Sequence, residues 1–338
     1  MIKVGILGFG FMGRMHFKCY KTLDNVHIVA ICDTDKSKFD KVSVIGNIPG
    51  TEQSLDLTEI KLFTDFDNML KQVELDCISI TLPTYMHRDF TIKALEAGIH
   101  VLCEKPMALD EKQCQDMIAT AKKSGKVLQI GHCIRFWPEY AKTKQIIQSG
   151  EYGRVLVATF RRLSSAPEWS WNNWMLETGK SGGALIDLHI HDTDFVQYVF
   201  GTPKMVRTAA IKGPSGDFDH LITQYIYDDE KIITAEGGWM MAPGFGFEMS
   251  FNIILEKATI TYDCTRKPTL KIYPIDGEAF TPEVETNDGY LSEITYFIKK
   301  VVGQKVPEII TPTDSLNSIK LVLAEKQSAN SGKEVTIQ

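Results

Sequence analysis

Short apolar runs alternate with segments of helical periodicity over the first 130 residues. Strand, helix, strand in this rhythm predicts a parallel sheet with helices on both faces. Right-handed crossovers bring the carboxyl ends of such strands to one edge of the sheet, where ligands bind. Four of the apolar runs end near Asp33, Pro83, Glu104 and Gly131.

The pattern changes after about residue 150, where short segments alternate apolar and polar side chains and are separated by turn signals. Such segments, with few helices between them, predict an open, mostly antiparallel sheet. Helical stretches near 183–200 and 290–302 interrupt the sheet, and one amphipathic helix over 315–331 follows it. The strand-like segments are 155–163, 204–212, 220–227, 232–240, 248–254, 258–262 and 269–273.

These patterns predict an α/β protein of two domains, because a chain of 338 residues exceeds the roughly 250–300 residues at which a single core stops growing. We expect a doubly wound parallel sheet in residues 1–130 and an α+β domain with a large open, mostly antiparallel sheet in residues 131–338. The C-terminal helix could pack back on the first domain. A sheet face left open is usually covered by a second subunit, so we expect a homodimer or homotetramer through this sheet.

The amino-acid composition limits the kinds of partner that the chain can bind and the compartment in which we expect it. The net charge is −6 and the basic residues form no stripe, so we expect neither nucleic acid nor a membrane surface as a partner. The seven cysteines are scattered without a CxxC pair, which favours neither a zinc cluster nor a disulfide framework. No apolar run is long enough to span a bilayer, and the first strand begins at Ile2, which leaves no room for a signal peptide. A cytoplasmic protein is the prediction.

A glycine motif lies between the first two apolar runs. Gly8, Gly10 and Gly13 have G-x-G-x-x-G spacing, and Asp33 follows Gly13 by 20 residues. In a dinucleotide site the first glycine makes the tight turn, the second admits the pyrophosphate, and the third lets helix pack on strand. The motif predicts a Rossmann domain, although a glycine-rich turn in another α/β protein is the alternative. The predicted cofactor contacts here are Gly8, Gly10, Phe11, Met12, Gly13 and Asp33.

The acid at the end of the second strand bears on the choice of cofactor. Asp33 can accept hydrogen bonds from both ribose hydroxyls, which favours NAD. Its negative charge would repel a 2′-phosphate. Lys36 and Lys38 lie close enough in sequence that NADP is possible as well.

Two further loops follow buried strands at the expected ligand edge. The loop from Thr81 to His87 could contact the adenosine or nicotinamide side of the cofactor, or could be a plain strand-to-helix turn. Glu104-Lys105-Pro106 places a lysine where, in an apolar cleft, it could hold a substrate hydroxyl and stabilise an alkoxide. The alternative is a surface salt bridge between Lys105 and Glu104. The predicted cofactor contacts in these loops are Thr81, Leu82, Pro83, His87, Glu104 and Lys105.

The segment 182–194 is dense in histidine and aspartate. Asp187 and His191 are four residues apart and would share a helix face. A histidine with a carboxylate one turn away is a general base with its orienting group, the minimal unit for deprotonating an alcohol. A metal site is the alternative, but His189 and His191 are two apart on a helix and point in different directions. We therefore predict no metal.

Together these motifs resemble the glucose–fructose oxidoreductase, inositol dehydrogenase and rhizopine-catabolism (Gfo/Idh/MocA) family over essentially the whole chain. The segment 97–106 (AGIHVLCEKP) and the Gly-Gly-x-x-x-Asp-x-x-x-His of 182–191 carry the resemblance. It implies NAD(P)-dependent oxidation of a sugar or polyol hydroxyl, or the reverse reduction. By position, Lys105 matches the catalytic lysine of the family, and Asp187 and His191 match its Asp/His pair.

The substrate side departs from the family pattern. Members often carry Gly at the place of His189, Asn at that of Cys133 and, in inositol dehydrogenases, Arg at that of Ile134, which weakens an assignment to inositol. The loop 169–174 holds three of the five tryptophans. Tryptophan faces bury the C–H surface of a sugar ring, although some of these rings could only anchor the loop. The predicted substrate contacts are Lys105, Cys133, Trp171, Trp174 and His191.

Three functions remain open at this point. The first is an NAD-dependent sugar or polyol dehydrogenase. The second is a non-catalytic sensor of the same fold, against which the intact Lys105, Asp187 and His191 argue. The third is a glycosidase that uses bound NAD for transient oxidation.

Overall fold

The computed structural model describes residues 1–40, 46 and 55–337. The chain forms two compact units. Unit 1 consists of residues 1–133, 169–174 and 289–316, and unit 2 consists of residues 134–168, 175–288 and 317–338. The segments 169–174 and 289–316 therefore belong to the same unit as the N-terminal third of the chain.

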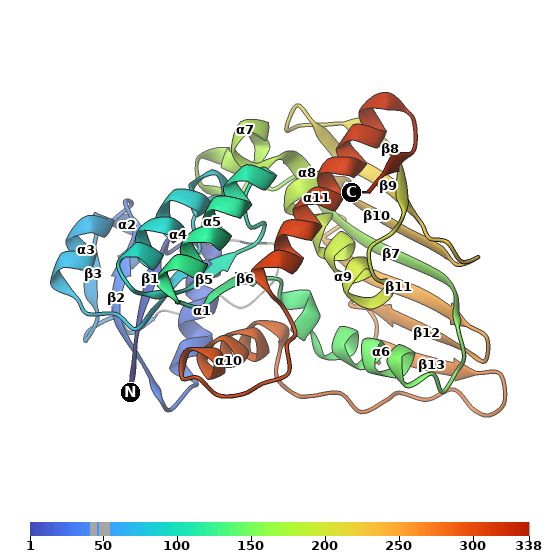
Figure 1. The fold of residues 1–338 in the computed structure, drawn as a ribbon, viewed down its shortest axis with the longest axis horizontal. Helices are drawn as coiled ribbons and strands as arrows, with labels where there is room; N and C mark the ends of the chain where they lie inside the picture. Colours follow the sequence, from blue (N-terminus) through green and yellow to red (C-terminus); the bar gives the residue numbers. More distant parts are fainter. Residues whose placement is uncertain (41–45, 47–54, 338) are drawn as a thin grey trace. The chain divides into compact units, whose positions relative to one another are not determined.

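Unit 1 is built on a six-stranded sheet in the order β3-β2-β1-β4-β5-β6 (Figure 1). Every pair of neighbouring strands in it is parallel, as the rhythm of apolar runs predicts. The order reverses direction at β1, so this is the doubly wound arrangement of dinucleotide-binding domains. The strands are β1 (Ile2–Leu7), β2 (Val26–Cys32), β3 (Lys61–Phe63), β4 (Cys77–Ile80), β5 (His100–Glu104) and β6 (Leu128–Gly131).

The helices of unit 1 begin and end at residues suited to those positions. The Asp65 side chain accepts a hydrogen bond from the Asn68 backbone at the start of α3, and Asp110 accepts one from Gln113 at the start of α5. Gly125 ends α5 in the left-handed conformation. The helices are α1 (Phe11–Lys21), α2 (Ser37–Asp40), α3 (Phe66–Gln72), α4 (His87–Glu96), α5 (Glu111–Ser124) and α10 (Gly289–Val301), with a 3-10 turn over Thr84–Met86.

Unit 2 holds an eight-stranded sheet in the order β13-β12-β11-β7-β10-β9-β8-β14. All neighbours are antiparallel except β7 and β10, which run parallel. The mostly antiparallel sheet predicted from alternation is thus confirmed. The strands are β7 (Val155–Ser165), β8 (Met205–Lys212), β9 (Phe218–Ile226), β10 (Ile232–Met241), β11 (Phe247–Leu255), β12 (Ala258–Asp263), β13 (Leu270–Pro274) and β14 (Val335–Thr336).

One face of this sheet carries the helices of unit 2 (Figure 1). An aromatic cluster joins α6, α9 and the strands: the ring of Tyr140 lies 4.7 Å from Phe195 and 5.0 Å from Phe251, each edge to face. Such pairs add to the burial of their apolar area. The helices are α6 (Pro138–Ser149), α7 (Thr178–Ser181), α8 (Gly183–Asp187), α9 (Ile190–Phe200) and α11 (Pro312–Ser331), the first five residues of which belong to unit 1. The 3-10 turns Cys133–Phe136 and Trp171–Leu176 each begin in unit 1 and end in unit 2.

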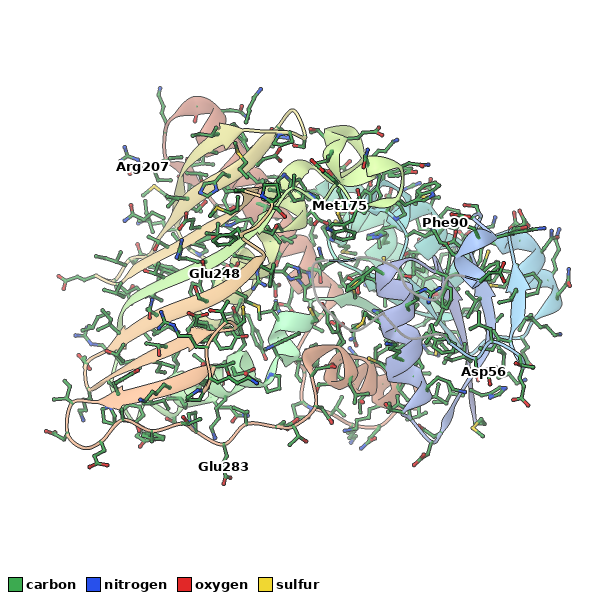
Figure 2. The ribbon with its side chains drawn as sticks, turned by 180° about the vertical axis from the view of Figure 1, so that it is seen from behind. Asp56, Phe90, Met175, Arg207, Glu248 and Glu283 are labelled. Atoms are coloured by element: carbon green, nitrogen blue, oxygen red, sulfur yellow. The ribbon has the colours of Figure 1, made fainter. Side chains whose placement is uncertain are left out.

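The opposite face of the sheet is exposed in the single chain. Along β9, β10 and β11 the buried positions alternate with exposed ones that include Ile222, Ile232, Asn252 and Ile254. Figure 2 shows Glu248 on β11 and Arg207 on β8 among these strands. The sheet is therefore open on one side, as expected.

Two sequence expectations need correction. The helix expected over 183–200 is interrupted, because Leu188 and His189 form a turn between α8 and α9. There the His189 amide donates to the Ala184 carbonyl five residues back, at 2.8 Å. The run that ends near Pro83 extends over Val73–Leu82 and predicts a longer strand than the structure has, since β4 covers only Cys77–Ile80.

The cysteines and the helices relate to two sequence expectations, the lack of a disulfide framework and the lack of a membrane span. The structure describes all seven cysteines, and each is a free thiol. Among the helices of the described residues, none combines the length and apolarity needed to cross a membrane.

Candidate active site

The glycine turn has the geometry that a dinucleotide requires. Gly8 has a φ of +93°, and a Cβ there would lie 2.7 Å from the Thr81 carbonyl oxygen. A Cβ on Gly13 would lie 2.0 Å from the Gly8 oxygen, so only glycine allows α1 to pack this close to the turn. A Cβ on Gly10, by contrast, would have no atom within 4 Å. The space beside Gly10, at the N-terminus of α1, fits the pyrophosphate of a dinucleotide.

Asp33 follows β2 and is buried. Its Oδ2 accepts a hydrogen bond from the Phe9 amide at 2.6 Å, and its Oδ1 accepts one from the Asp35 amide at 2.9 Å. The Lys38 ammonium lies 2.8 Å from Oδ2 and 3.1 Å from Oδ1. The backbone thus fixes the orientation of the carboxylate, and one lysine neutralises it.

The loop after β4 is tied to the glycine turn and to the loop after β5. The Thr81 hydroxyl donates to the Gly8 carbonyl at 2.6 Å. The two ring nitrogens of His87 each lie 2.8 Å from a carbonyl oxygen, one of Leu82 and one of Pro106. Burial lowers the pKa of His87, and the two carbonyls only partly oppose this. His87 therefore links the two loops rather than pointing both nitrogens toward a ligand.

Glu104 anchors a buried polar network beneath Lys105. Its Oε1 lies 3.0 Å from His16 Nε2, and its Oε2 accepts from the Lys105 amide at 3.2 Å. His16 Nδ1 in turn lies 2.9 Å from the Ser79 hydroxyl. Burial by itself raises the pKa of Glu104, but the hydrogen bond and charge of His16 and the charge of Lys105 outweigh it and leave the pKa below its usual value. Glu104 is thus a buried, ionised partner of His16, not a surface residue.

Lys105 stands at the carboxyl end of β5, between the buried Glu104 and the buried Pro106, and is itself partly exposed. Cys133 is buried at the start of the 3-10 turn that follows β6. Both residues therefore lie at the ligand edge of the parallel sheet, where the sequence predicts them.

In unit 2 a glycine pair leads into the Asp/His segment. Gly182 and Gly183 both have positive φ, +79° and +73°, which allows the sharp turn from α7 into α8. Asp187 is the last residue of α8 and is buried, whereas His191 lies in the first turn of α9 and is partly exposed. The turn at Leu188 separates them, so they do not share one regular helix as the spacing suggests.

The dense acids and histidines around this pair are engaged in buried ion pairs. Asp192 binds Arg162 and Asp194 binds Arg135, each through two hydrogen bonds of 2.8 to 3.0 Å. His189 is fully buried, with Nε2 lying 3.2 Å from Glu325 Oε2 of α11. The described residues hold no group of three His, Cys, Asp or Glu side chains able to bind a metal ion.

The tryptophan loop 169–174 is part of unit 1 and packs against its N-terminal segment. The ring of Trp169 lies 6.1 Å from that of Phe11, and Lys38 Nζ lies 5.2 Å from the ring centre of Trp171. Asn172 and Asn173 hold the turn between them in left-handed conformations. Trp171 and Trp174 are predicted substrate contacts, but the partner that the structure gives Trp171 belongs to the Asp33 corner of the cofactor site.

Sequence reasoning missed several residues of this site. It does not single out His16, which contacts Glu104, or Ser79, which contacts His16. Ala324-Glu325 belongs to the family resemblance, but the sequence gives no sign that Glu325 contacts His189. Each lies far along the chain from its partner, so no local pattern marks it. Lys38 was noted only for its nearness in sequence to Asp33.

Two family models match most of the chain. Residues 2–132 match the model of an oxidoreductase family with an NAD-binding Rossmann fold, and residues 140–261 match the Gfo/Idh/MocA C-terminal domain. The chain belongs to the Gfo/Idh/MocA family of oxidoreductases. The predicted family, its two-part α/β fold, its oxidoreductase class and its NAD cofactor are thereby confirmed.

Relatives of this Gfo/Idh/MocA member extend over its whole length. It is 28% identical to D-glucoside 3-dehydrogenase of Escherichia coli (strain K12), covering 99% of this chain and 97% of that protein. It is 26% identical to scyllo-inositol 2-dehydrogenase (NAD(+)) of Bacillus subtilis (strain 168), covering 99% and 96%. A levoglucosan dehydrogenase, solved with NADH and levoglucosan, has the same fold, with a TM-score of 0.82 at 19% identity over 99% of each chain.

Proposed function

We propose that this chain is an NAD-dependent dehydrogenase that oxidises a secondary hydroxyl of a sugar or polyol, of the cyclitol or aldose class. The observation that carries the proposal is the retention of Lys105, Asp187 and His191 in a chain whose glycine turn and Asp33 fit a dinucleotide. Full-length relatives named as sugar and polyol dehydrogenases support the substrate class. A protein that only senses a sugar has no need of a base and a lysine.

The proposed roles follow from the chemistry of the side chains. His191, partly exposed and four residues after the buried Asp187, takes the proton of the hydroxyl. Lys105 donates a hydrogen bond to the same oxygen and stabilises the negative charge that develops on it. Asp187 orients the site or relays the proton. Bound NAD supplies the acceptor for the hydride that leaves the carbon.

The remaining predicted contacts keep their proposed roles. The glycine turn and the loops after β4 and β5 hold the cofactor, through Gly8, Gly10, Phe11, Met12, Gly13, Asp33, Thr81, Leu82, Pro83, His87, Glu104 and Lys105. For His87 the role is indirect, because its ring joins two of these loops. Cys133, Trp171 and Trp174 are the proposed substrate contacts.

A nicotinamide absorbance screen tests the proposal. Purified protein is mixed with NAD⁺ and, in turn, with cyclitols, aldoses, sugar acids and sugar alcohols. Reduction of NAD⁺ by one stereochemical class supports the dehydrogenase and identifies its substrate type. Silence across the panel while NADH still binds contradicts it and favours the sensor. Hydrolysis of a glycoside without net change in the cofactor contradicts it in favour of the NAD-assisted glycosidase.

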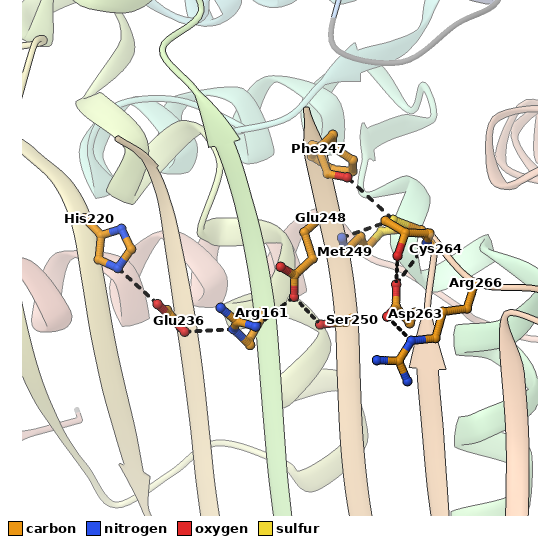
Figure 3. Close-up of polar contacts among 11 residues, drawn as sticks. Arg161, His220, Glu236, Phe247, Glu248, Met249, Ser250, Asp263, Cys264 and Arg266 are labelled. Atoms are coloured by element: carbon orange, nitrogen blue, oxygen red, sulfur yellow. Dashed lines mark hydrogen bonds and ion pairs between the residues drawn. The ribbon is translucent and has the colours of Figure 1, made fainter. Parts of the chain in front are cut away.

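We also propose that a second copy of the chain covers the open face of the sheet in unit 2. A row of side chains crosses this face with its charges already paired: Arg161 binds Glu236 and Glu248 at 2.9 and 3.0 Å, and His220 lies 3.1 Å from Glu236 (Figure 3). The exposed Ile222 pairs with Glu236 in the sheet, and the exposed Ile232 and Ile254 lie further along the same face, on either side of Val157. A paired row next to aliphatic side chains can be covered by its own copy without leaving a lone buried charge.

A further inference from the structure

The corner of unit 1 that receives the adenosine ribose contains one lysine more than an NAD site requires. Lys38 Nζ bridges both oxygens of Asp33, and only 14% of the lysine side chain and 4% of the aspartate side chain are exposed. The same ammonium lies 5.2 Å from the ring centre of Trp171. Lys38 therefore sits between a carboxylate and an aromatic face.

The backbone fixes this position. The Lys38 amide donates to the Asp35 carbonyl at 3.1 Å, and the Lys38 carbonyl accepts from Arg14 Nη2 at 2.8 Å. Because the backbone of the residue is held at both ends, the ammonium moves by rotation of its side chain, and the face of Trp171 lies within its reach. The ring face attracts a cation, so it offers the ammonium a second place.

The hydrogen bonds of Asp33 decide what this lysine does. A carboxylate offers about four lone-pair sites, and Asp33 already accepts from the Phe9 amide, the Asp35 amide and Lys38 at both oxygens. The two ribose hydroxyls of NAD must donate to the same oxygens. The ammonium has to withdraw toward Trp171 when they do, so Lys38 competes with NAD for the carboxylate.

A 2′-phosphate presents the opposite case. It carries a charge of about −1.5 to −2 and accepts hydrogen bonds, so Asp33 alone would repel it. The Lys38 ammonium lies where it can bind the Asp33 carboxylate and the phosphate at the same time. No hydrogen bond of Asp33 has to break when the phosphate binds.

We propose that Lys38, held between Asp33 and the face of Trp171, selects the cofactor in this site and admits the 2′-phosphate of NADP beside the free ribose of NAD. Trp171, besides its proposed contact with the substrate, then acts on the cofactor as the second place of the ammonium. The proposal rests on the dinucleotide site alone and not on the oxidation of any hydroxyl.

Binding of NADH and NADPH tests it, because the two differ only in the 2′-phosphate. Dissociation constants are measured by nicotinamide fluorescence without substrate, so a failed dehydrogenase assignment leaves the test intact. In the unaltered protein we expect the two constants to agree within about tenfold. Lys38→Met should weaken NADPH by about 10- to 100-fold, the loss expected of a charged hydrogen bond, and leave NADH unchanged or tighter. Lys38→Arg should keep the binding of NADPH.

Two further variants sharpen the result. Asp33→Asn should act in the opposite direction, weakening NADH while NADPH is unchanged or tighter. Trp171→Leu should weaken NADH, because the displaced ammonium loses its second place, and leave NADPH unchanged, whereas Trp171→Phe should change neither, since phenylalanine retains a ring face. Lys36→Met is the matched control: it removes a lysine two positions away, and both constants should stay within about threefold.

The outcomes are distinguishable. The proposal is wrong if the unaltered protein binds NADH but not NADPH, if Lys38→Met changes both constants equally, or if Lys36→Met has the same effect as Lys38→Met. Added salt screens the attraction between the ammonium and the phosphate. The proposal is supported if salt lowers NADPH affinity steeply in the unaltered protein and only slightly in Lys38→Met.

Discussion

His191 carries the largest share of the proposed chemistry. It lies partly exposed at the start of α9, four residues after the buried Asp187 that ends α8. His191→Ala should lower turnover by about 10²- to 10⁴-fold, the usual contribution of a general base, while NADH still binds. Steady-state turnover and NADH fluorescence measure the two effects. His27→Ala, which changes an exposed histidine of β2, is the control, and equal turnover in both variants would exclude His191 as the base.

Glu104 governs the stability of the ligand edge of unit 1. It is a buried carboxylate whose Oε1 lies 3.0 Å from His16, and removing one partner of a buried pair typically costs about 3–5 kcal/mol. Glu104→Gln should therefore lower the free energy of unfolding, measured with urea, by an amount in that range. Glu74→Gln should change this free energy far less, because the Glu74 pair with Lys3 is exposed. Equal shifts would mean that the buried pair stabilises little.

The same pair has a predictable pH dependence. The pKa of Glu104 lies below its usual value in the folded protein. Its carboxylate therefore stabilises the fold fully at every pH above the pKa of a free glutamate, about 4.3. This stabilisation is lost as the pH falls through the lower, folded pKa. The difference in unfolding midpoint between the unaltered protein and Glu104→Gln should be constant near neutral pH and shrink below about pH 4. A difference that instead grows in acid would contradict the assignment.

At the scale of elements, the turn between α8 and α9 is held by packing against β10. A Cβ on Gly237 would lie 2.5 Å from His189 Nδ1, so Gly237→Ala must displace the histidine. Overpacking of this kind costs about 1–3 kcal/mol, and turnover should fall because the displaced turn carries Asp187 and His191. Thermal unfolding and turnover are the measurements.

The clash itself can be removed to check that explanation. His189→Ala in the Gly237→Ala background should recover stability relative to the sum of the single changes, since the two residues are in contact. Gly244→Ala, where a Cβ has no neighbour within 4 Å, should have little effect. Additive losses in the double variant would show that the two residues act separately.

The elements differ in how far the sequence determines them. The strands of unit 2 follow from period-two alternation, and those from β7 to β13 begin and end within a few residues of the prediction. The broken helix does not follow, because the turn at His189 is shaped by Glu325 and Gly237, which lie far along the chain. The two residues of β14 are too few to form a pattern. The glycine turn and Asp33 were predictable because the motif is local, whereas the partners that fix Asp33, Glu104 and His189 are set by tertiary contacts.

The exposed sheet of unit 2 concerns the whole molecule. Ile232 and Ile254 are 50% and 43% exposed in the single chain, and the register places them on either side of Val157, four residues along β7 from Arg161. If a second copy covers this face, Ile232→Lys would place a charge in a buried interface, where an unpaired charge is strongly unfavourable. The variant should elute as a monomer in size-exclusion chromatography with light scattering, while the unaltered protein elutes as a dimer or tetramer.

The control for this change is Val302→Lys, at an apolar side chain of unit 1 that is 54% exposed. It adds the same charge to a surface outside the sheet, so the mass should not change. A monomeric unaltered protein would exclude the interface, and an Ile232→Lys variant that keeps its mass would place the contact elsewhere. Because Arg161 is already paired within the face, the mass of the unaltered protein should depend little on salt. Strong dissociation by salt would mean that charges between the copies, rather than the aliphatic side chains, hold them together.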